Sequence, residues 1–196
     1  PSTSNTPRDE EVGGIPVDSD YVIFVVDTSG SMRAIWDRVT QQIINILTIH
    51  PQVKGFQILD DQGKAILAGY SGKWIPDVPF RRKSVMKLFK GWQSASNSSP
   101  VEGVLTALRK YKKQGHTIAI YVFGDDYTGG SYDSVIADIT KKNRDQKDGK
   151  RLAKIHAVGF PSQYTTDRFA ILMRELTKQN DGTFIALPTY DKNWKP

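Results

Sequence analysis

Two strongly apolar segments of the chain each run into an aspartate among small polar residues. The segment YVIFVV ends at Asp27, and Ser29 and Ser31 follow at alternate positions. The segment TIAIYVF is followed, one glycine later, by Asp125. Carboxylates and hydroxyls are hard oxygen ligands, which Mg²⁺, Mn²⁺ and Ca²⁺ prefer. The pattern therefore predicts a divalent-cation site if the fold brings the two segments together.

A third small polar segment, QSASNSS, ends at Ser99 directly before Pro100. Proline is favoured in the first turn of a helix, so a helix is expected to begin there. Ser98 and Ser99 could then supply a further hydroxyl to a cation. Serine also caps helices, and a capping role explains Ser99 equally well.

The elements that must position these loops alternate between strand and helix. Short apolar or alternating runs predict strands over residues 21–26, 53–59, 64–68, 117–123, 152–160 and 183–187. Helical spacing of apolar residues predicts helices over residues 35–49, 80–92, 101–111, 131–143 and 168–179.

This alternation predicts an α/β fold of three layers, α/β/α and Rossmann-like, around a mostly parallel sheet of about six strands. Residues 53–59 and 64–68, joined by the turn-forming sequence DDQG, are expected to form a hairpin that gives the sheet one antiparallel edge strand. In an open parallel sheet, ligands bind beyond the carboxyl ends of the strands. The three polar loops are therefore expected to converge on one edge.

Length and composition limit the possibilities further. The 196 residues suit one domain, expected over residues 21–188, with a flexible linker over 1–20 and a tail over 189–196. Lysine and arginine total 27 against 21 acidic residues, a net charge of +6, which favours acidic partners without naming one. With no cysteine, disulfides, thiolate metal sites and cysteine nucleophiles are excluded.

The sequence Asp27-x-Ser29-x-Ser31 after an apolar strand, together with the order of elements, resembles the metal-ion-dependent adhesion site (MIDAS) of von Willebrand factor type A (VWA) domains. The resemblance extends over residues 20–187. It implies that the first loop supplies three metal ligands and that Asp125 supplies another.

The resemblance also implies a hydroxyl ligand from the second loop, where the family has a threonine. Ser99 stands at that position, with Ser98 as the alternative. Asp126, where the family often has glycine, adds a negative charge and is not expected to be a ligand. The implied cofactor is Mg²⁺, or alternatively Mn²⁺ or Ca²⁺.

In the family, an acidic residue of a partner protein completes the coordination of the metal. The resemblance therefore implies a protein-binding module that engages a Glu or Asp of its partner, and no enzymatic activity. The alternative is a metal-dependent phosphoesterase-type enzyme, since aspartate at a strand end also serves phosphoryl transfer. Such enzymes use a second aspartate two positions after the first, where this chain has Ser29. No nucleic-acid motif is present, and no nucleic-acid partner is expected.

Small cysteine-free relatives of this kind are often bacterial and presented outside the inner membrane. The Ser/Thr/Pro-rich residues 1–20 resemble a spacer, and a membrane anchor upstream of this chain would precede it. The expected location is thus the periplasm or cell surface, with the cytoplasm as the alternative.

Overall fold

A six-stranded sheet forms the centre of the protein. The computed structural model describes residues 18–50, 53–94, 96–113 and 115–189. The strand order is β3-β2-β1-β4-β5-β6, and every neighbouring pair is parallel except β2 with β3, which is antiparallel. The strands are β1 (Tyr21–Val26), β2 (Gly55–Asp60), β3 (Ile75–Pro76), β4 (Ile118–Gly124), β5 (Lys154–Gly159) and β6 (Phe184–Ala186).

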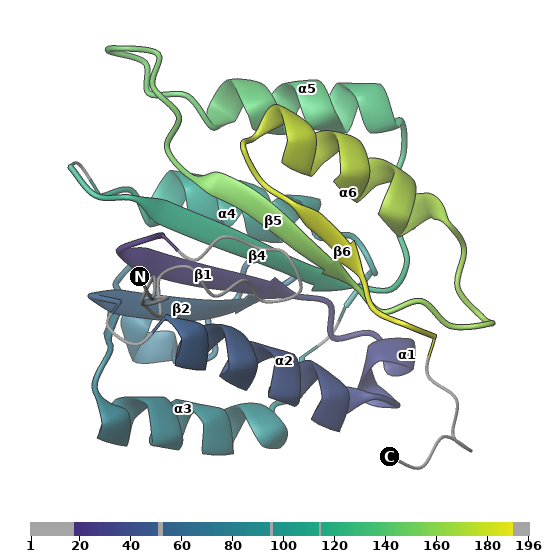
Figure 1. Ribbon diagram of the computed structural model, residues 1–196, viewed down its shortest axis with the longest axis horizontal. Coiled ribbons are helices and arrows are strands. Elements are labelled where there is room, and N and C mark those ends of the chain that lie inside the picture. Colours follow the sequence, from purple (N-terminus) through teal and green to yellow (C-terminus); the bar gives the residue numbers. More distant parts are fainter. Residues whose placement is uncertain (1–17, 51–52, 95, 114, 190–196) are drawn as a thin grey trace, which may run out of the picture.

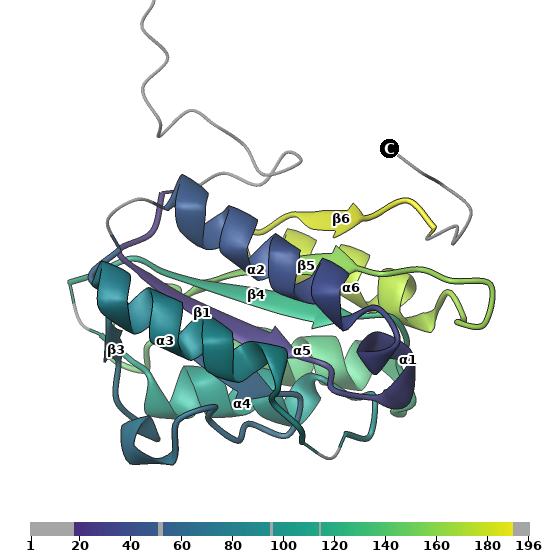
Figure 2. The ribbon, with the colours of Figure 1, turned by 90° about the horizontal axis from the view of Figure 1, so that it is seen from below.

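Helices cover both faces of the sheet (Figures 1 and 2). One face carries α2 (Trp36–Ile49) and α3 (Pro79–Lys90), and the other carries α4 (Val101–Lys110), α5 (Tyr132–Lys142) and α6 (Arg168–Gln179). Because successive residues of a strand point to opposite faces, Val22 and Phe24 join the first core whereas Ile23 and Val25 join the second. The predicted three-layer α/β/α architecture with one antiparallel edge strand is confirmed.

The antiparallel edge strand lies later in the chain than the predicted hairpin would place it. Residues 64–68 were expected to form this strand, but they make only an isolated bridge between Leu59 and Ala65. The chain then turns through the 3₁₀ helix η2 (Ala68–Tyr70) and returns as β3. The buried Gln57 side chain donates to the carbonyls of Tyr70 and Lys73, at 3.0 and 2.9 Å. These bonds hold residues 70–73 to β2. The prediction of a strand over residues 64–68 is wrong, because only Ala65 in this range bridges to β2.

A short helix, α1 (Gly30–Arg33), occupies part of the segment expected to be a loop after β1. It begins directly after Ser29, and its Met32 side chain is fully buried in the core under α2. In Figure 1, α1 lies at the end of the sheet toward which the parallel strands point. The helix thereby fixes the first polar loop at the carboxyl edge of the sheet.

The start of the described chain is bound to the opposite edge. The Asp20 amide donates to the Thr117 carbonyl at 3.0 Å, and the Asp20 carboxylate accepts from the Thr117 amide at 3.1 Å. Most of the predicted linker and tail, residues 1–17 and 190–196, lies outside the described residues. Within the described part of the chain, no helix is long and apolar enough to cross a bilayer.

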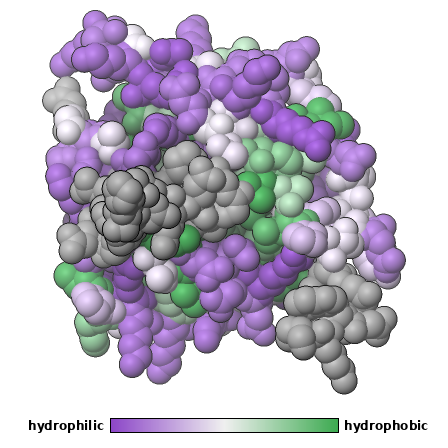
Figure 3. Space-filling view, in the orientation of Figure 1, coloured by the Kyte–Doolittle hydropathy of each residue, from purple (hydrophilic) through white to green (hydrophobic). Residues whose placement is uncertain are grey.

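The face of the molecule seen in Figure 3 is largely hydrophilic, and its hydrophobic residues gather mainly over β6. Ile185 in this strand and Leu187 after it are half-buried and pack against the core on the α2 side.

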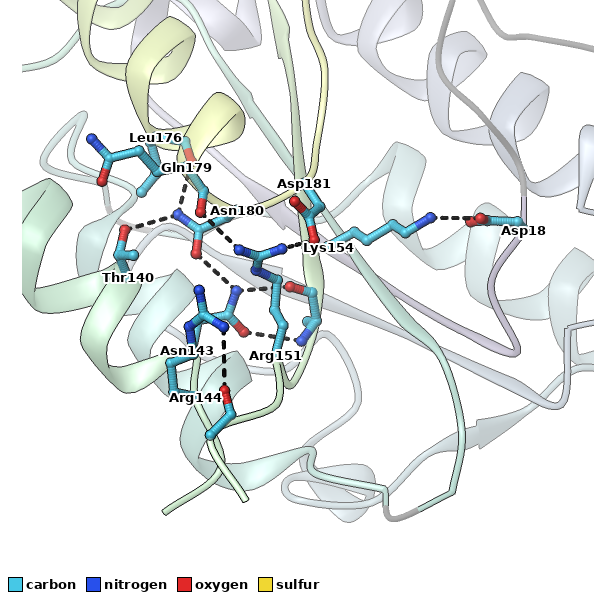
Figure 4. Close-up of polar contacts among 12 residues, drawn as sticks. Asp18, Thr140, Asn143, Arg144, Arg151, Lys154, Leu176, Gln179, Asn180 and Asp181 are labelled. Atoms are coloured by element: carbon cyan, nitrogen blue, oxygen red, sulfur yellow. Dashed lines mark hydrogen bonds and ion pairs between the residues drawn. The ribbon is translucent and has the colours of Figure 1, made fainter. Parts of the chain in front are cut away.

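Two buried asparagines, hydrogen-bonded to each other, join the carboxyl ends of α5 and α6 (Figure 4). Asn143 and Asn180 have no exposed surface. The Asn143 amide group donates to the Ala153 carbonyl at 2.7 Å and to Asn180 Oδ1 at 2.9 Å, and its Oδ1 accepts from the Ala153 amide at 2.9 Å. Asn180 Nδ2 donates to Thr140 Oγ1 and to the Leu176 carbonyl, at 3.0 and 2.8 Å. We call Asn143 and Asn180 the amide cluster.

Candidate metal centre

The carboxyl ends of β1, β2 and β4 bring three aspartates to one edge of the sheet. Val26 is in register with Asp60 of β2 and with Phe123 of β4, and the Asp27 amide continues the ladder by donating to the Phe123 carbonyl at 2.9 Å. Asp27, Asp61 and Asp125 thus follow three adjacent strands, and all three are buried. We call these three side chains, with the serines that contact them, the acid cluster.

The first loop folds back onto Asp27. Asp27 Oδ1 accepts from the Ser29 amide at 2.7 Å, and Ser29 is the N-cap residue of α1, which begins at the next residue. The hydroxyls of Ser29 and Ser31 lie 3.1 Å apart. Ser29 is half-buried and Ser31 is exposed, so this pair of oxygens faces the solvent side of the cluster. The three predicted first-loop ligands therefore lie together.

The hydroxyl that reaches Asp27 from the second loop belongs to Ser96. Ser96 Oγ lies 2.9 Å from Asp27 Oδ1 and 2.6 Å from Asp61 Oδ2. Ser99 faces the cluster through its backbone amide, which is 3.4 Å from Asp61 Oδ2, and Ser98 takes a left-handed conformation with φ of 50°. Coordination by Ser99, or by Ser98, stays a prediction, and Ser96 is the second-loop hydroxyl that the geometry favours.

The third loop places Asp125 beside the first. Asp125 is 5% exposed, and the nearby Ser31 side chain acts to lower the pKa of its carboxyl. Asp126 points elsewhere, because its carboxylate accepts from the amide of Tyr127 at 2.8 Å and from the amide and hydroxyl of Thr166. Asp126 thus anchors the loop after β5 to the loop after β4.

Arg168 holds the remainder of the third loop. Its Nε donates to the Tyr127 carbonyl at 2.8 Å and its Nη2 to the Gly129 carbonyl at 2.6 Å. The second and third loops are joined by the Thr128 amide, which donates to the Ser98 carbonyl at 3.1 Å. The loops around the acid cluster therefore form one hydrogen-bonded layer.

Asp61 is the carboxylate of this cluster that sequence reasoning missed. The predicted tight turn over residues 60–63 is present, since the Gly63 amide donates to the Asp60 carbonyl at 3.0 Å. The turn follows directly on β2, so it places Asp61 at the sheet edge. The missed signal is that β2, the other neighbour of β1, is also followed by an aspartate, as β1 and β4 are. Close packing of α4 fixes this end of β2, since the Gly103 amide donates to the Asp61 carbonyl at 2.8 Å and a Cβ on Gly103 would lie 2.8 Å from the Asp60 carbonyl oxygen.

Burial makes the charged form of these aspartates unfavourable. Loss of hydration raises the pKa of Asp27, against hydrogen bonds from Ser29 and Ser96, and the charge of Asp125 raises it further. Burial likewise raises the pKa of Asp61, with an added contribution from the charge of Asp27. Burial also raises the pKa of Asp125, opposed by the nearby Ser31 side chain. Each of these shifts would be reversed by a nearby positive charge.

The oxygens left over in the cluster match the needs of a cation. Asp27 Oδ2, Asp61 Oδ1 and Asp125 Oδ1 are buried and, within the described residues, have no hydrogen-bond partner. A buried carboxylate oxygen without a partner is costly, and a hard divalent ion satisfies it. In the described ranges, no three Asp, Glu, His or Cys side chains are grouped closely enough to hold an ion unaided. An ion here would therefore need hydroxyls such as those of Ser29 and Ser31 in addition to the carboxylates.

Comparison with known proteins bears on the fold. The structure is similar to a solved chain described as von Willebrand factor type A from Catenulispora acidiphila, with a TM-score of 0.64 and 10% sequence identity. The match covers 86% of this chain but 38% of the other, so this chain spans less than half the length of the protein it resembles. No protein-family model and no curated protein matches the sequence. At this identity the similarity is one of architecture: the chain has the fold of a von Willebrand factor type A domain.

Proposed function

We propose that this chain is a divalent-metal-dependent protein-binding module. The metal would be held by Asp27, Ser29, Ser31, Asp125 and a second-loop hydroxyl, Ser96 by geometry or Ser99 by sequence. The preferred ion is Mg²⁺, with Mn²⁺ and Ca²⁺ as substitutes. Bound there, the ion would supply a positive charge with an open position for an oxygen ligand.

One observation carries this proposal. Asp27 Oδ2 and Asp125 Oδ1 are buried carboxylate oxygens with no partner among the described residues, and they lie beside two serine hydroxyls 3.1 Å apart. A helix-capping loop would leave no carboxylate oxygen without a partner, because a capping oxygen accepts hydrogen bonds from backbone amides. The unmet acceptors indicate a cation ligand set in place of a simple turn.

The surface next to the first loop suits an acidic partner. Gly30 and Ser31 are exposed, so an oxygen from another molecule can approach the serine side of the cluster. A cavity of about 330 Å³ beside α1 is lined by Arg33, Arg38 and Lys90, with Asp37 as its acidic residue. This excess of positive charge would attract a carboxylate-bearing segment, which supports a Glu or Asp as the group presented to the metal.

Calorimetric titration of Mg²⁺ and Mn²⁺ tests the metal site. The wild-type chain is expected to bind one ion, and Asp27→Ala is expected to bind none measurably. Asp126→Asn is the matched control, because it removes a carboxylate one position from Asp125 whose partners are Thr166 and Tyr127. Equal heats from the wild type and Asp27→Ala would remove the basis of the proposal.

Water-proton relaxation of the Mn²⁺-loaded chain tests the open position. The tripeptide Gly-Glu-Gly is expected to lower the relaxation enhancement, because its carboxylate would displace metal-bound water. Gly-Gln-Gly, with blocked termini in both peptides, is the control. An equal response to the two peptides would contradict recognition of an acidic side chain.

The phosphoesterase alternative is tested on the same samples. The partners of the Asp27 carboxylate are a hydroxyl and a backbone amide, a set that suits ligand positioning. We expect no hydrolysis of p-nitrophenyl phosphate with Mg²⁺ above the rate of Asp27→Ala. Turnover that Asp27→Ala abolishes would instead favour the enzyme.

A further inference from the structure

We propose that Asp61 is an additional carboxylate of the metal centre, outside the Asp-x-Ser-x-Ser loop and its predicted partners. The inference rests on the proposed metal site and adds the loop after β2 to it. It concerns the residues that hold the ion and is independent of what partner the module binds.

Strand register places Asp61 beside Asp27. Tyr21 to Val26 of β1 pair with Gly55 to Asp60 of β2 without interruption, so the next residues, Asp27 and Asp61, leave the sheet side by side. Neighbouring strands lie about 4.8 Å apart. Two carboxylates therefore leave the sheet edge at the same level, at the side of the sheet where the ion is proposed to bind.

Ser96 cannot satisfy both carboxylates with one hydroxyl proton. Its Oγ is within hydrogen-bond distance of Asp27 Oδ1, at 2.9 Å, and of Asp61 Oδ2, at 2.6 Å. A hydroxyl donates one hydrogen bond and accepts others, whereas an ionised carboxylate only accepts. With both carboxylates ionised, the Ser96 hydroxyl can donate to only one of them. The other contact then brings two oxygens together with no hydrogen between them, unless a further proton or a cation is present. A cation shared by Asp27 and Asp61 would remove this conflict.

The neighbouring Asp60 shows what a structural aspartate looks like at this edge. Asp60 Oδ1 accepts from the amides of Gln62 and Lys64 at 3.0 and 2.8 Å, and its Oδ2 accepts from the Ser94 hydroxyl. Both oxygens of Asp60 therefore have donors. Asp61 is fully buried, yet its Oδ1 has no partner in the part of the chain that the structure describes. Turn formation explains Asp60 and leaves Asp61 Oδ1 unexplained.

A further carboxylate changes what the site can do. Affinity for hard divalent cations rises with the number of charged oxygen ligands, and Ca²⁺ accepts more protein oxygens than Mg²⁺, which retains several waters. Asp61 would therefore tighten ion binding and would lower the positive charge left for a partner carboxylate. The chain is expected to hold its ion more firmly than the loop residues alone would allow.

Asp61→Asn tests this role by calorimetry with MgCl₂ and MnCl₂. The asparagine oxygen can still accept from Ser96 and from the amides of Asn97 and Ser99, so the loop should keep its shape. Ion affinity is expected to fall by about tenfold or more. Asp126→Asn, the charge control at the same edge, should stay within about threefold of the wild type.

Two further measurements keep the test decisive. Circular dichroism with thermal unfolding in EDTA reports whether Asp61→Asn folds. If it does not fold, Ser96→Ala, which removes the shared hydroxyl, takes its place and should also weaken ion binding. The rise in melting temperature on adding Mg²⁺ is expected to shrink in Asp61→Asn.

The outcomes separate the two proposals. A wild type that binds no ion would overturn the metal site altogether. A wild type that binds, with Asp61→Asn equal to it, tighter than it or no weaker than Asp126→Asn, would overturn the role of Asp61 and leave the proposed function standing. A selective loss in Asp61→Asn supports both.

Discussion

The acid cluster and the amide cluster bury polar side chains at opposite ends of the sheet, and their hydrogen bonding differs. Each amide of Asn143 and Asn180 offers both donors and acceptors, and the pair satisfies itself with backbone groups and Thr140 (Figure 4). The carboxylates of Asp27 and Asp61 accept only, and they share one Ser96 hydroxyl. The first arrangement is complete within the chain, whereas the second leaves one buried oxygen of each carboxylate without a hydrogen-bond partner among the described residues.

Burial alone therefore does not identify a functional site in this protein. Asn143 and Asp61 are both fully buried, and each lies next to a second buried polar residue. The useful difference is the balance of donors and acceptors. A balanced cluster is expected to stabilise the fold, and an unbalanced one is expected to bind a ligand at the expense of stability.

Removal of one amide gives the largest expected effect on stability. Asn143→Ala would leave both backbone groups of Ala153 and Oδ1 of Asn180 buried without a partner, at about 1–3 kcal/mol each. The free energy of unfolding is expected to fall by about 4 kcal/mol, measured by urea denaturation at pH 7. The exposed amide of Gln179, which bonds to Glu175, provides the control, and Gln179→Ala should change stability by less than about 0.5 kcal/mol.

Metal addition should stabilise the chain through the acid cluster only. With free Mg²⁺ at one hundred times its dissociation constant, the free energy of unfolding is expected to rise by about 2.7 kcal/mol. Asn143→Ala should gain the same increment, measured by denaturation with Mg²⁺ and with EDTA. Asp27→Asn should gain none, and an equal gain there would show that the ion binds elsewhere.

Acid should destabilise the chain through two buried histidines. Burial lowers the pKa of His50 and of His156 to about 4. Both rings contact Tyr121: His50 Nε2 lies 3.0 Å from its hydroxyl, and the His156 ring stacks on its ring. Because these pKa values lie below the unfolded value of about 6.5, the stability they confer is present above pH 6.5 and is lost as pH falls toward 4. The charged groups that act on the two rings are those of Asp18, Asp77, Arg82 and Lys154, and the His50 ring also acts on His156.

The expected loss between pH 7 and pH 4.5 is about 1–3 kcal/mol per histidine. Urea denaturation in EDTA measures it, and His156→Gln should have a flatter pH profile than the wild type. The raised pKa values of the acid cluster act in the opposite direction, but they contribute equally to both proteins and cancel in the comparison. Parallel profiles would contradict the role of His156.

The smallest expected effect has the opposite sign. In EDTA at pH 7, Asp27→Asn should raise the free energy of unfolding by about 1 kcal/mol, because it removes a buried charge that lacks a counter-charge. The reverse exchange in the amide cluster, Asn143→Asp, should destabilise the chain. If both exchanges destabilise it, the proposed imbalance of the acid cluster is wrong.

Strong local patterns predicted most of the fold. The apolar run of β1 is a strand at the predicted bounds, and the helix predicted over residues 168–179 is α6 (Arg168–Gln179). These elements bury a continuous run or one regular face, and either pattern can be read from a single segment. The strand expected over residues 64–68 is reduced to a bridge at Ala65, and the chain leaves the sheet edge through the 3₁₀ helix that follows. The buried Gln57 side chain holds that later part of the excursion through the carbonyls of Tyr70 and Lys73.

The choice among equivalent side chains was beyond local patterns. The second loop contains four serines between residues 93 and 99, and only the path of the chain, including the left-handed backbone of Ser98, determines that Ser96 meets Asp27. For Asp61, the outcome depended on where β2 ends and on its register with β1.

The sequence by itself determined which residues could do the chemistry and which elements would carry them. Asp27, Ser29, Ser31 and Asp125 were identified by type and by their place after apolar strands, because local composition controls both. The tertiary structure alone decided that Ser96 and Asp61 join them. Pairing of strands and packing of α4 against β2 bring together residues far apart in the chain, and such distances are set by the whole sheet.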